Sequence, residues 1–384
     1  MLVVEENMFI KHSVVVMYLI IIMLVLSSCM PAAVETIQPI LTMKPNSTVP
    51  PLESAIPIAS DTSVPPTSIP PTPIPVVQSL EISLSNATQI EEFGQVFQSS
   101  PYRVRWALDD NSFGVISQDQ VIQYDVESLI SIGAYFAEEP EMLFDFSADG
   151  NILAVTSDQI TIELRDIHTG EILGLLEPPD MFMDVVFSPD GQSLVTTSFE
   201  EIAASFWDFE TAEILSTQNG FETAAPTYRI EFSPDGQYLF WIARSQVQVM
   251  EIENEQLGSS FFHEDFVESV AISHDGQVLT TAAAGTLDDT FSPMIFFWDA
   301  TSGDLLGEVV TENIATGMAF SKDGSMLVVS DGGKLLFLDA ASRENVFSMD
   351  AHSEPINSLA ISPDGRTLAT TSIDDSVRLW QVLP

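Results

Sequence analysis

The sequence from about residue 80 to residue 384 predicts an all-β domain built from one repeated unit. An apolar-Ser-x-Asp-Gly motif recurs six times, and its glycines are spaced by 41, 45, 40, 48 and 41 residues. Short runs with alternating apolar and polar residues separate the copies, as expected of half-buried strands. A regular period of this length indicates a repeat architecture, so the repeats are considered before any local structure.

The six copies of the motif share an apolar residue, a serine and an Asp-Gly pair. They are Phe146-Ser147-Ala148-Asp149-Gly150, Phe187-Ser188-Pro189-Asp190-Gly191, Phe232-Ser233-Pro234-Asp235-Gly236, Ile272-Ser273-His274-Asp275-Gly276, Phe320-Ser321-Lys322-Asp323-Gly324 and Ile361-Ser362-Pro363-Asp364-Gly365. A degenerate seventh copy, Trp106-Ala107-Leu108-Asp109-Asp110-Asn111, precedes the first by about one period. Ser-Pro-Asp-Gly is a tight-turn sequence, because proline presets φ and Asp and Gly tolerate turn conformations.

Each turn lies between two predicted strands, and two further strands complete the period. Residues 194–197 and 368–371 are examples of the strand that follows the turn. Residues 160–164 and 377–380 alternate and are examples of the third strand, while residues 172–176 are an example of the fourth.

Four strands in each period of 40 to 45 residues resemble the WD-repeat β-propeller family. The resemblance covers residues 80–384, and its third strands often end in an aromatic residue followed by a polar one, as in Trp298-Asp299. It implies a seven-bladed β-propeller of four-stranded antiparallel blades. Six and eight blades are the alternatives.

The last copy lacks a fourth strand, because the sequence stops at Pro384 just after its third strand. Residues 87–97 carry apolar residues at Ile90, Phe93 and Val96 and have no blade of their own. We therefore expect this N-terminal strand to close the last blade, which would leave no open ring.

The last copy also keeps a pattern that the family uses structurally. The resemblance implies a hydrogen-bonded tetrad formed by His352, Ser372, Asp374 and Trp380. Serine, histidine and aspartate together can also indicate nucleophilic catalysis, but these residues fall at the family's packing positions. The other blades have lost the set; the third has Glu201 where the last has Asp374.

The first 29 residues resemble a bacterial lipoprotein signal peptide. Residues 14–26 form an apolar run of 13 residues, which is short for a membrane span, and Leu26-Ser27-Ser28-Cys29 follows. The resemblance implies that Cys29, the single cysteine, is lipid-modified and becomes the mature N-terminus. Acidic residues at Glu5 and Glu6 depart from the expected positive flank, and a start at Met8 would remove them.

Residues 30–79 contain 12 of the 23 prolines and many serines and threonines. Proline fixes φ and removes backbone donors, so this composition predicts an extended Pro/Ser/Thr-rich disordered stalk. If Cys29 is lipidated, the stalk would hold the propeller away from a membrane on its extracytoplasmic face. An inert tail is the alternative.

The charge of −44 argues against nucleic acid as a partner, because phosphate binding requires clustered Lys and Arg. A single cysteine excludes an intramolecular disulfide. Histidine spacing matches no zinc motif, and the sequence has no phosphate-binding glycine loop, so we expect no metal and no cofactor.

We expect a monomeric propeller that binds protein partners on one loop face and has no catalytic activity. Family topology assigns to that face the aromatic and acidic residues Phe182, Tyr228, Phe261, Phe262, His263, Phe266, Asp288, Asp289 and Phe291. Two other functions remain open: a hydrolase or lyase that acts on an extracellular polymer, and the sensory ectodomain of a membrane complex. The enzyme hypothesis rests on the carboxylate pairs Asp109-Asp110 and Asp288-Asp289.

Overall fold

A computed structural model describes residues 79–107, 110–117, 119–137, 142–156, 160–198, 203–219, 229–254, 256–287 and 290–382. The chain divides into two units between Thr72 and Pro73, and every described residue belongs to the second. The predicted signal peptide, Cys29 and all but the last residue of the predicted stalk lie outside the described residues.

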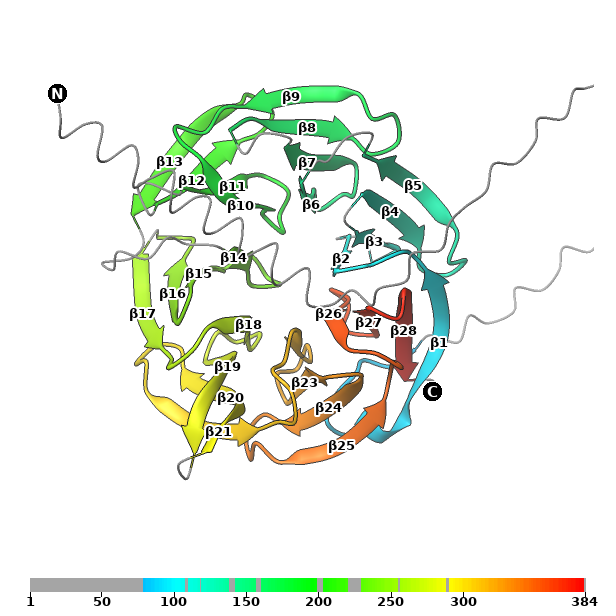
Figure 1. Ribbon diagram of the computed structural model, residues 1–384, viewed down its shortest axis with the longest axis vertical. Helices are drawn as coiled ribbons and strands as arrows, with labels where there is room; N and C mark the ends of the chain where they lie inside the picture. The colour runs from blue at the N-terminus through cyan, green and yellow to red at the C-terminus, as the bar shows by residue number, and fades with distance from the viewer. Residues whose placement is uncertain are drawn as a thin grey trace, which may run out of the picture. The chain divides into compact units, whose positions relative to one another are not determined.

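The described residues form seven four-stranded antiparallel sheets arranged as blades around a centre (Figure 1). Within blades 1 to 6, the strands follow one another in sequence order from the centre outward. Blade 1 consists of β2 (Arg103–Trp106), β3 (Ser112–Ile116), β4 (Gln120–Asp125) and β5 (Ser131–Phe136). Blade 2 consists of β6 (Met142–Phe146), β7 (Ile152–Thr156), β8 (Ile162–Asp166) and β9 (Ile172–Leu176). Blade 3 consists of β10 (Phe182–Phe187), β11 (Leu194–Ser198), β12 (Ala203–Asp208) and β13 (Glu213–Asn219).

The next three blades repeat this arrangement. Blade 4 consists of β14 (Arg229–Phe232), β15 (Tyr238–Ala243), β16 (Gln246–Glu251) and β17 (Gln256–Phe262). Blade 5 consists of β18 (Val267–Ile272), β19 (Val278–Leu287), β20 (Thr290–Asp299) and β21 (Leu305–Val310). Blade 6 consists of β22 (Met318–Phe320), β23 (Met326–Asp331), β24 (Lys334–Asp339) and β25 (Asn345–Asp350). The predicted all-β, seven-bladed propeller is therefore confirmed.

Blade 7 joins the two ends of the described chain, as the sequence predicts. Its strands are β26 (Ile356–Ile361), β27 (Thr367–Ser372), β28 (Ser376–Val382) and β1 (Ile90–Phe97), and β1 pairs with β28. A short 3-10 helix, η1 (Ala87–Gln89), leads into β1. The side chain of Ile90 packs in one core cluster with Trp380 and Val382, so the closure is apolar as well as hydrogen-bonded.

Each Ser-x-Asp-Gly motif forms the same turn between the first and second strands of its blade. In the third blade the Ser188 hydroxyl donates to Asp190 Oδ1 at 2.6 Å and accepts the Ser193 N–H at 2.9 Å. The Gly191 N–H donates to the Ser188 carbonyl at 3.0 Å, and Gly191 has a φ of +69°. Glycine adopts this left-handed conformation without steric cost, which explains why the motif ends in glycine.

The blades pack face to face, so their middle strands are buried on both sides. Every residue of β3, β11, β23 and β27 is buried, whereas outer strands such as β25 alternate between partly and fully exposed residues. Small and β-branched residues fill these buried strands, as in Leu194-Val195-Thr196-Thr197-Ser198. The described residues include no helix long and apolar enough to cross a membrane.

Candidate functional site

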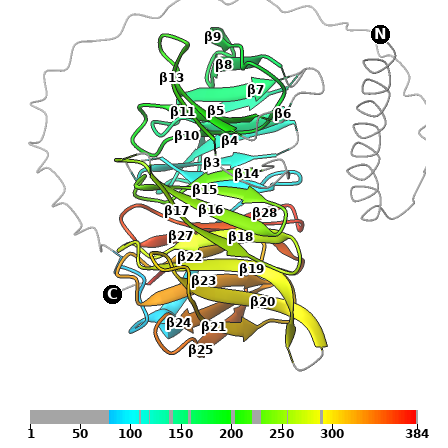
Figure 2. The same cartoon turned by 90° about the vertical axis from the view of Figure 1, so that its left-hand side faces the viewer.

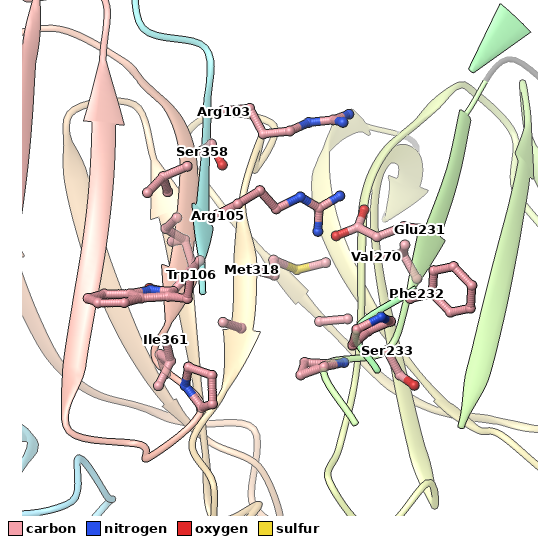
Figure 3. Close-up of a pocket in the computed structure, with 18 of the residues that line it drawn as sticks. Arg103, Arg105, Trp106, Glu231, Phe232, Ser233, Val270, Met318, Ser358 and Ile361 are labelled. Carbon is pink, nitrogen blue, oxygen red and sulfur yellow. The ribbon is translucent and has the colours of Figure 1, made fainter. Parts of the chain in front are cut away.

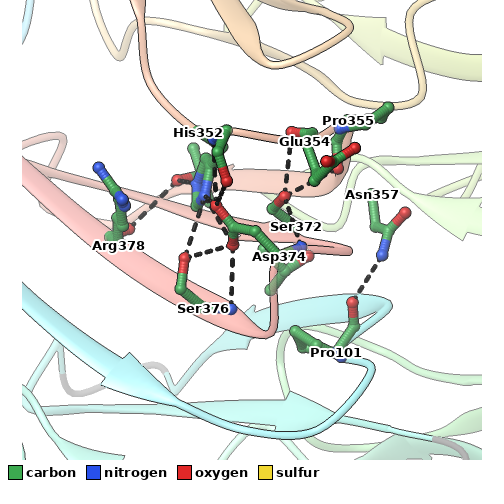
Figure 4. Close-up of polar contacts among 12 residues, drawn as sticks. Pro101, His352, Glu354, Pro355, Asn357, Ser372, Asp374, Ser376 and Arg378 are labelled. Atoms are coloured by element: carbon green, nitrogen blue, oxygen red, sulfur yellow. Dashed lines mark hydrogen bonds and ion pairs between the residues drawn. The ribbon is translucent and has the colours of Figure 1, made fainter.

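The blade 7 polar cluster is a continuous chain of hydrogen bonds between strands. Trp380 Nε1 donates to Thr370 Oγ1 at 3.0 Å, and Thr370 Oγ1 lies 2.8 Å from His352 Nε2. His352 Nδ1 lies 3.1 Å from Asp374 Oδ2 and 3.1 Å from the Ser376 hydroxyl (Figure 4). These partners assign a neutral imidazole whose Nδ1–H donates to Asp374 and whose Nε2 accepts from Thr370.

The sequence-predicted hydroxyl of this tetrad, Ser372, lies outside the chain of contacts, and Thr370 takes its place. Ser372 donates to the carbonyl oxygen of Pro355 at 2.9 Å and accepts the Asp374 N–H at 3.1 Å (Figure 4). Residues 370 and 372 lie on the same face of β27, because side chains alternate along a strand. The diagonal from Trp380, which pairs directly with Leu368, reaches Thr370 and not Ser372.

In this cluster the imidazole of His352 is neutral and the carboxylate of Asp374 is charged. Desolvation lowers the pKa of His352 by more than the neighbouring Asp374 carboxylate raises it. Burial alone would raise the pKa of Asp374, but hydrogen bonds from Ser376 and His352 outweigh it and lower that pKa. Thr370 is completely buried. Its hydroxyl is therefore not accessible to a substrate, and the geometry is that of a structural link between strands rather than an acyl-transfer site.

Two other blades retain the tryptophan–threonine half of this cluster, which sequence reasoning missed. Trp207 Nε1 donates to Thr196 Oγ1 at 3.0 Å in blade 3, and Trp298 Nε1 donates to Thr281 Oγ1 at 2.9 Å in blade 5. In each case the threonine lies two residues beyond the direct cross-strand partner of the tryptophan. In the sequence, a Trp at the end of the third strand together with a Thr in the second strand would have predicted this hydrogen bond.

His263 occupies in blade 5 the position of His352, four residues before the first strand, but without its partners. Both ring nitrogens of His263 are buried and make no hydrogen bond to any described residue. Its ring contacts Phe296 and Trp298 edge-on, with centroids 5.0 Å and 5.4 Å away. Desolvation lowers the pKa of His263 to about 4, so the imidazole is neutral near pH 7.

The residues predicted for a partner face divide into buried and exposed groups. Phe182 and Phe261 are both 1% exposed and belong to the core, which corrects their assignment to the surface. Each lies in a strand, and Phe261 pairs directly with Val247, so its ring points between blades. Tyr228, Asp288 and Asp289 lie outside the described residues.

Three predicted aromatic side chains do lie on the surface, and we call them the phenylalanine face: Phe262, Phe266 and Phe291. Their exposed fractions are 62%, 49% and 59%. Phe262 ends β17, and Phe266 immediately precedes β18, so the first two belong to the loop that joins blades 4 and 5. Phe291 belongs to the long β19–β20 hairpin, which extends beyond the strands of the neighbouring blades (Figure 2).

A hydrogen bond holds the hairpin against that loop. Thr286 pairs directly with Phe291 across the hairpin, and its hydroxyl donates to Glu264 Oε2 at 2.8 Å. Glu264 lies between Phe262 and Phe266 in sequence, so the hairpin and the loop are on the same side of the ring. The three exposed phenylalanines therefore belong to a loop and a hairpin that are joined through the acidic residue Glu264.

Carboxylates proposed for catalysis have structural roles where they are described. Asp110 Oδ1 accepts the Asp364 N–H at 2.8 Å and so connects blade 1 to the turn of blade 7. Its neighbour Asp109 lies outside the described residues. Within the described ranges, no group of three or more His, Cys, Asp or Glu residues could hold a metal ion.

Comparison with known proteins gives one family match, to "WD domain, G-beta repeat", at residues 343–381. Those residues cover β25 to β28 and include the polar cluster of blade 7.

Three curated relatives illustrate the similarity to whole proteins. Protein FIZZY-RELATED 3 of Arabidopsis thaliana is 28% identical over 39% of this chain and 29% of its own length. The transcriptional corepressor LEUNIG_HOMOLOG of the same plant is 23% identical over 62% of this chain and 34% of its own length. Anaphase-promoting complex subunit cdh1 of Dictyostelium discoideum is 29% identical over 32% of this chain and 16% of its own length.

The chain thus spans about a third or less of the length of each of these relatives. The family match runs from β25 of blade 6 into blade 7, which has the complete polar cluster, and blades 3 and 5 keep the tryptophan–threonine half of that cluster. Together with the sevenfold arrangement of sheets, the comparisons support a WD-repeat propeller.

Proposed function

We propose that the propeller is a non-catalytic scaffold that holds a protein partner on the phenylalanine face. The observation that carries this proposal is the grouping of three exposed phenylalanine rings on one loop and one hairpin. Aromatic side chains contribute a large share of binding energy at protein interfaces, whereas isolated exposed apolar residues are ordinary. Among the relatives, one is named as a complex subunit and one as a transcriptional corepressor, which agrees with a binding role.

The surroundings of the three rings define the chemistry of the expected partner. Glu264, in the loop that carries Phe262 and Phe266, and Glu268, in β18, are exposed, and Asp265 is half-buried. The net charge of the chain adds a long-range negative potential. We therefore expect a partner with an apolar pocket for the rings and a rim of Lys and Arg, whose association slows as salt is added.

Crosslinking in the native membrane followed by partner identification tests this proposal. A triple Phe262→Ala, Phe266→Ala, Phe291→Ala variant should lose the crosslinked protein. The control is Phe136→Ala, which removes an equally exposed ring from the outer strand of blade 1. Loss of the same crosslink in the Phe136 variant, or its retention in the triple variant, would exclude the phenylalanine face as the binding site.

We also propose that the scaffold is anchored to a bacterial membrane through a lipid on Cys29, on the extracytoplasmic side. The support is the sequence Leu26-Ser27-Ser28-Cys29 directly after a short apolar run. In a bacterial host, the protein should incorporate radiolabelled palmitate and partition with membranes. A Cys29→Ser variant should lose the label, and an equally labelled variant would refute lipidation at this residue.

A further inference from the structure

The seven innermost strands surround a cavity of about 650 Å³ at the centre of the ring. Residues of all seven blades line it, with β2 on one side and β14 on the other (Figure 3). A volume of this size is within the range of small-molecule sites in proteins.

The charge of the cavity lining is opposite to that of the chain. Of the ten basic residues from residue 79 onward, four line the cavity, namely Arg103, Arg105, Arg229 and Lys322. Three acidic residues line it as well, namely Asp145, Glu231 and Asp235. Basic side chains therefore outnumber acidic ones in the cavity of a chain whose net charge is −44.

Two of the cavity arginines have carboxylates that balance their charge. Arg229 Nη2 lies 2.9 Å from Glu231 Oε2, and Arg229 Nη1 donates to the Glu268 carbonyl at 2.8 Å. Burial would lower the pKa of Arg103, but Asp184 and Asp145 raise it, so this guanidinium is charged and already compensated.

Arg105 differs because its guanidinium has an ion pair with Asp145 but no hydrogen bond at Nε. Its Nε lies 3.3 Å from Asp145 Oδ1 but makes no hydrogen bond to any described residue. Asp145 uses its other oxygen to accept the Phe187 N–H at 3.1 Å. Figure 3 shows the Arg105 guanidinium extended across the cavity toward Glu231. Its two terminal nitrogens are thus presented to the space between β2 and β14 as a planar pair of donors.

Part of the remaining cavity wall is apolar. Val270, Met318 and Ile361 line it opposite and beside the arginine (Figure 3). A site with a planar cation on one wall and an apolar surface on another fits an organic molecule with an anionic head and an apolar body. The guanidinium fork matches the geometry of carboxylate and phosphate oxygens.

We propose that the central cavity binds a small organic oxyanion, a carboxylate or a phosphate monoester, through Arg105. The apolar body of the ligand packs against Val270, Met318 and Ile361. This site is separate from the phenylalanine face, whose residues do not line the cavity.

Isothermal titration of the purified full chain tests this proposal with three probes: phenylacetate, phenyl phosphate and the neutral 2-phenylethanol. We expect one or both anions to bind saturably, with the stronger one identifying the head group, and the alcohol to bind at least about tenfold more weakly. An Arg105→Met variant should lose about tenfold or more in affinity for the anion. An Arg105→Lys variant should retain part of the binding, because it keeps the charge but not the fork.

The matched control is Arg378→Met. Arg378 also forms a single ion pair, at 3.1 Å to Glu92, and its side chain is 27% exposed, as is that of Arg105. Circular dichroism verifies that each variant is folded. If Arg105→Met does not fold, the loss of affinity is measured with Arg105→Lys instead. Absence of saturable binding by either anion, equal binding of the alcohol, or equal losses in the Arg105 and Arg378 variants would overturn the proposal.

Discussion

Replacement of Thr370 by valine tests whether one hydroxyl joins two buried partners in blade 7. The substitution keeps the shape of the side chain, but it leaves both Trp380 Nε1 and His352 Nε2 without their bonds at 3.0 Å and 2.8 Å. A buried polar group left unsatisfied costs about 1–3 kcal/mol. Two such groups in one place predict a loss of about 2–6 kcal/mol in the free energy of unfolding.

The protein contains its own control for this prediction. Thr196 is buried as well, but its hydroxyl accepts a hydrogen bond only from Trp207, at 3.0 Å. Thr196→Val should therefore lose about 1–3 kcal/mol in the free energy of unfolding. Urea unfolding followed by tryptophan fluorescence and by circular dichroism gives both values, provided that the slope with denaturant stays unchanged. A Thr370 variant that is no less stable than the Thr196 variant would refute the two-partner chain.

Three further predictions concern stability. His263→Phe should make the urea midpoint less dependent on pH, because the pKa of His263 is about 4 in the folded protein. As pH falls from about 6.5 to 4, the wild type should lose up to about 3 kcal/mol in the free energy of unfolding. The variant has no imidazole to protonate and should not show this loss. Equal pH profiles would show that His263 is not buried as a neutral group. Gly365→Ala should lower the melting temperature more than Gly324→Ala. Both glycines have positive φ, but a Cβ at Gly365 would lie 2.9 Å from Lys322 Cβ, whereas a Cβ at Gly324 would meet no atom within 4 Å. Similar melting temperatures would contradict this close approach. Ile90→Ala should cost about 2–4 kcal/mol by removing core packing in blade 7, while Phe97→Ala in the same strand, 74% exposed, should change stability by about 0.5 kcal/mol or less. A small effect at Ile90 would show that β1 contributes little to the ring.

The fold could be predicted because its information is local and repeated. A Ser-x-Asp-Gly turn depends on hydrogen bonds within six residues, such as those around Ser188, so each copy of the sequence specifies its turn without the rest of the ring. The period then fixes the number of strands between turns. The missing fourth strand and the unassigned apolar residues at Ile90 and Val96 were sufficient to predict the closure.

The candidate site was less predictable because it depends on cross-strand register and on which side a side chain faces. Thr370 and Ser372 share a face of β27, and only the pairing of Trp380 with Leu368 decides between them. Phe261 and Phe262 are neighbours of the same type, yet alternation buries the first and exposes the second. Arg105 shows the same limit, since its role depends on seven strands from distant parts of the chain meeting around one cavity.

The pairing of β1 with β28 has a consequence for the order in which the protein matures. Synthesis proceeds from the N-terminus, so among the described strands β1 is made first and its partner β28 last. Until then, β1 has an unpaired edge that could pair with another chain. Because contacts across so long a stretch of sequence form slowly, we expect the last blade to limit the folding rate. The nascent chain would be most prone to aggregation just before β28 emerges and pairs with β1.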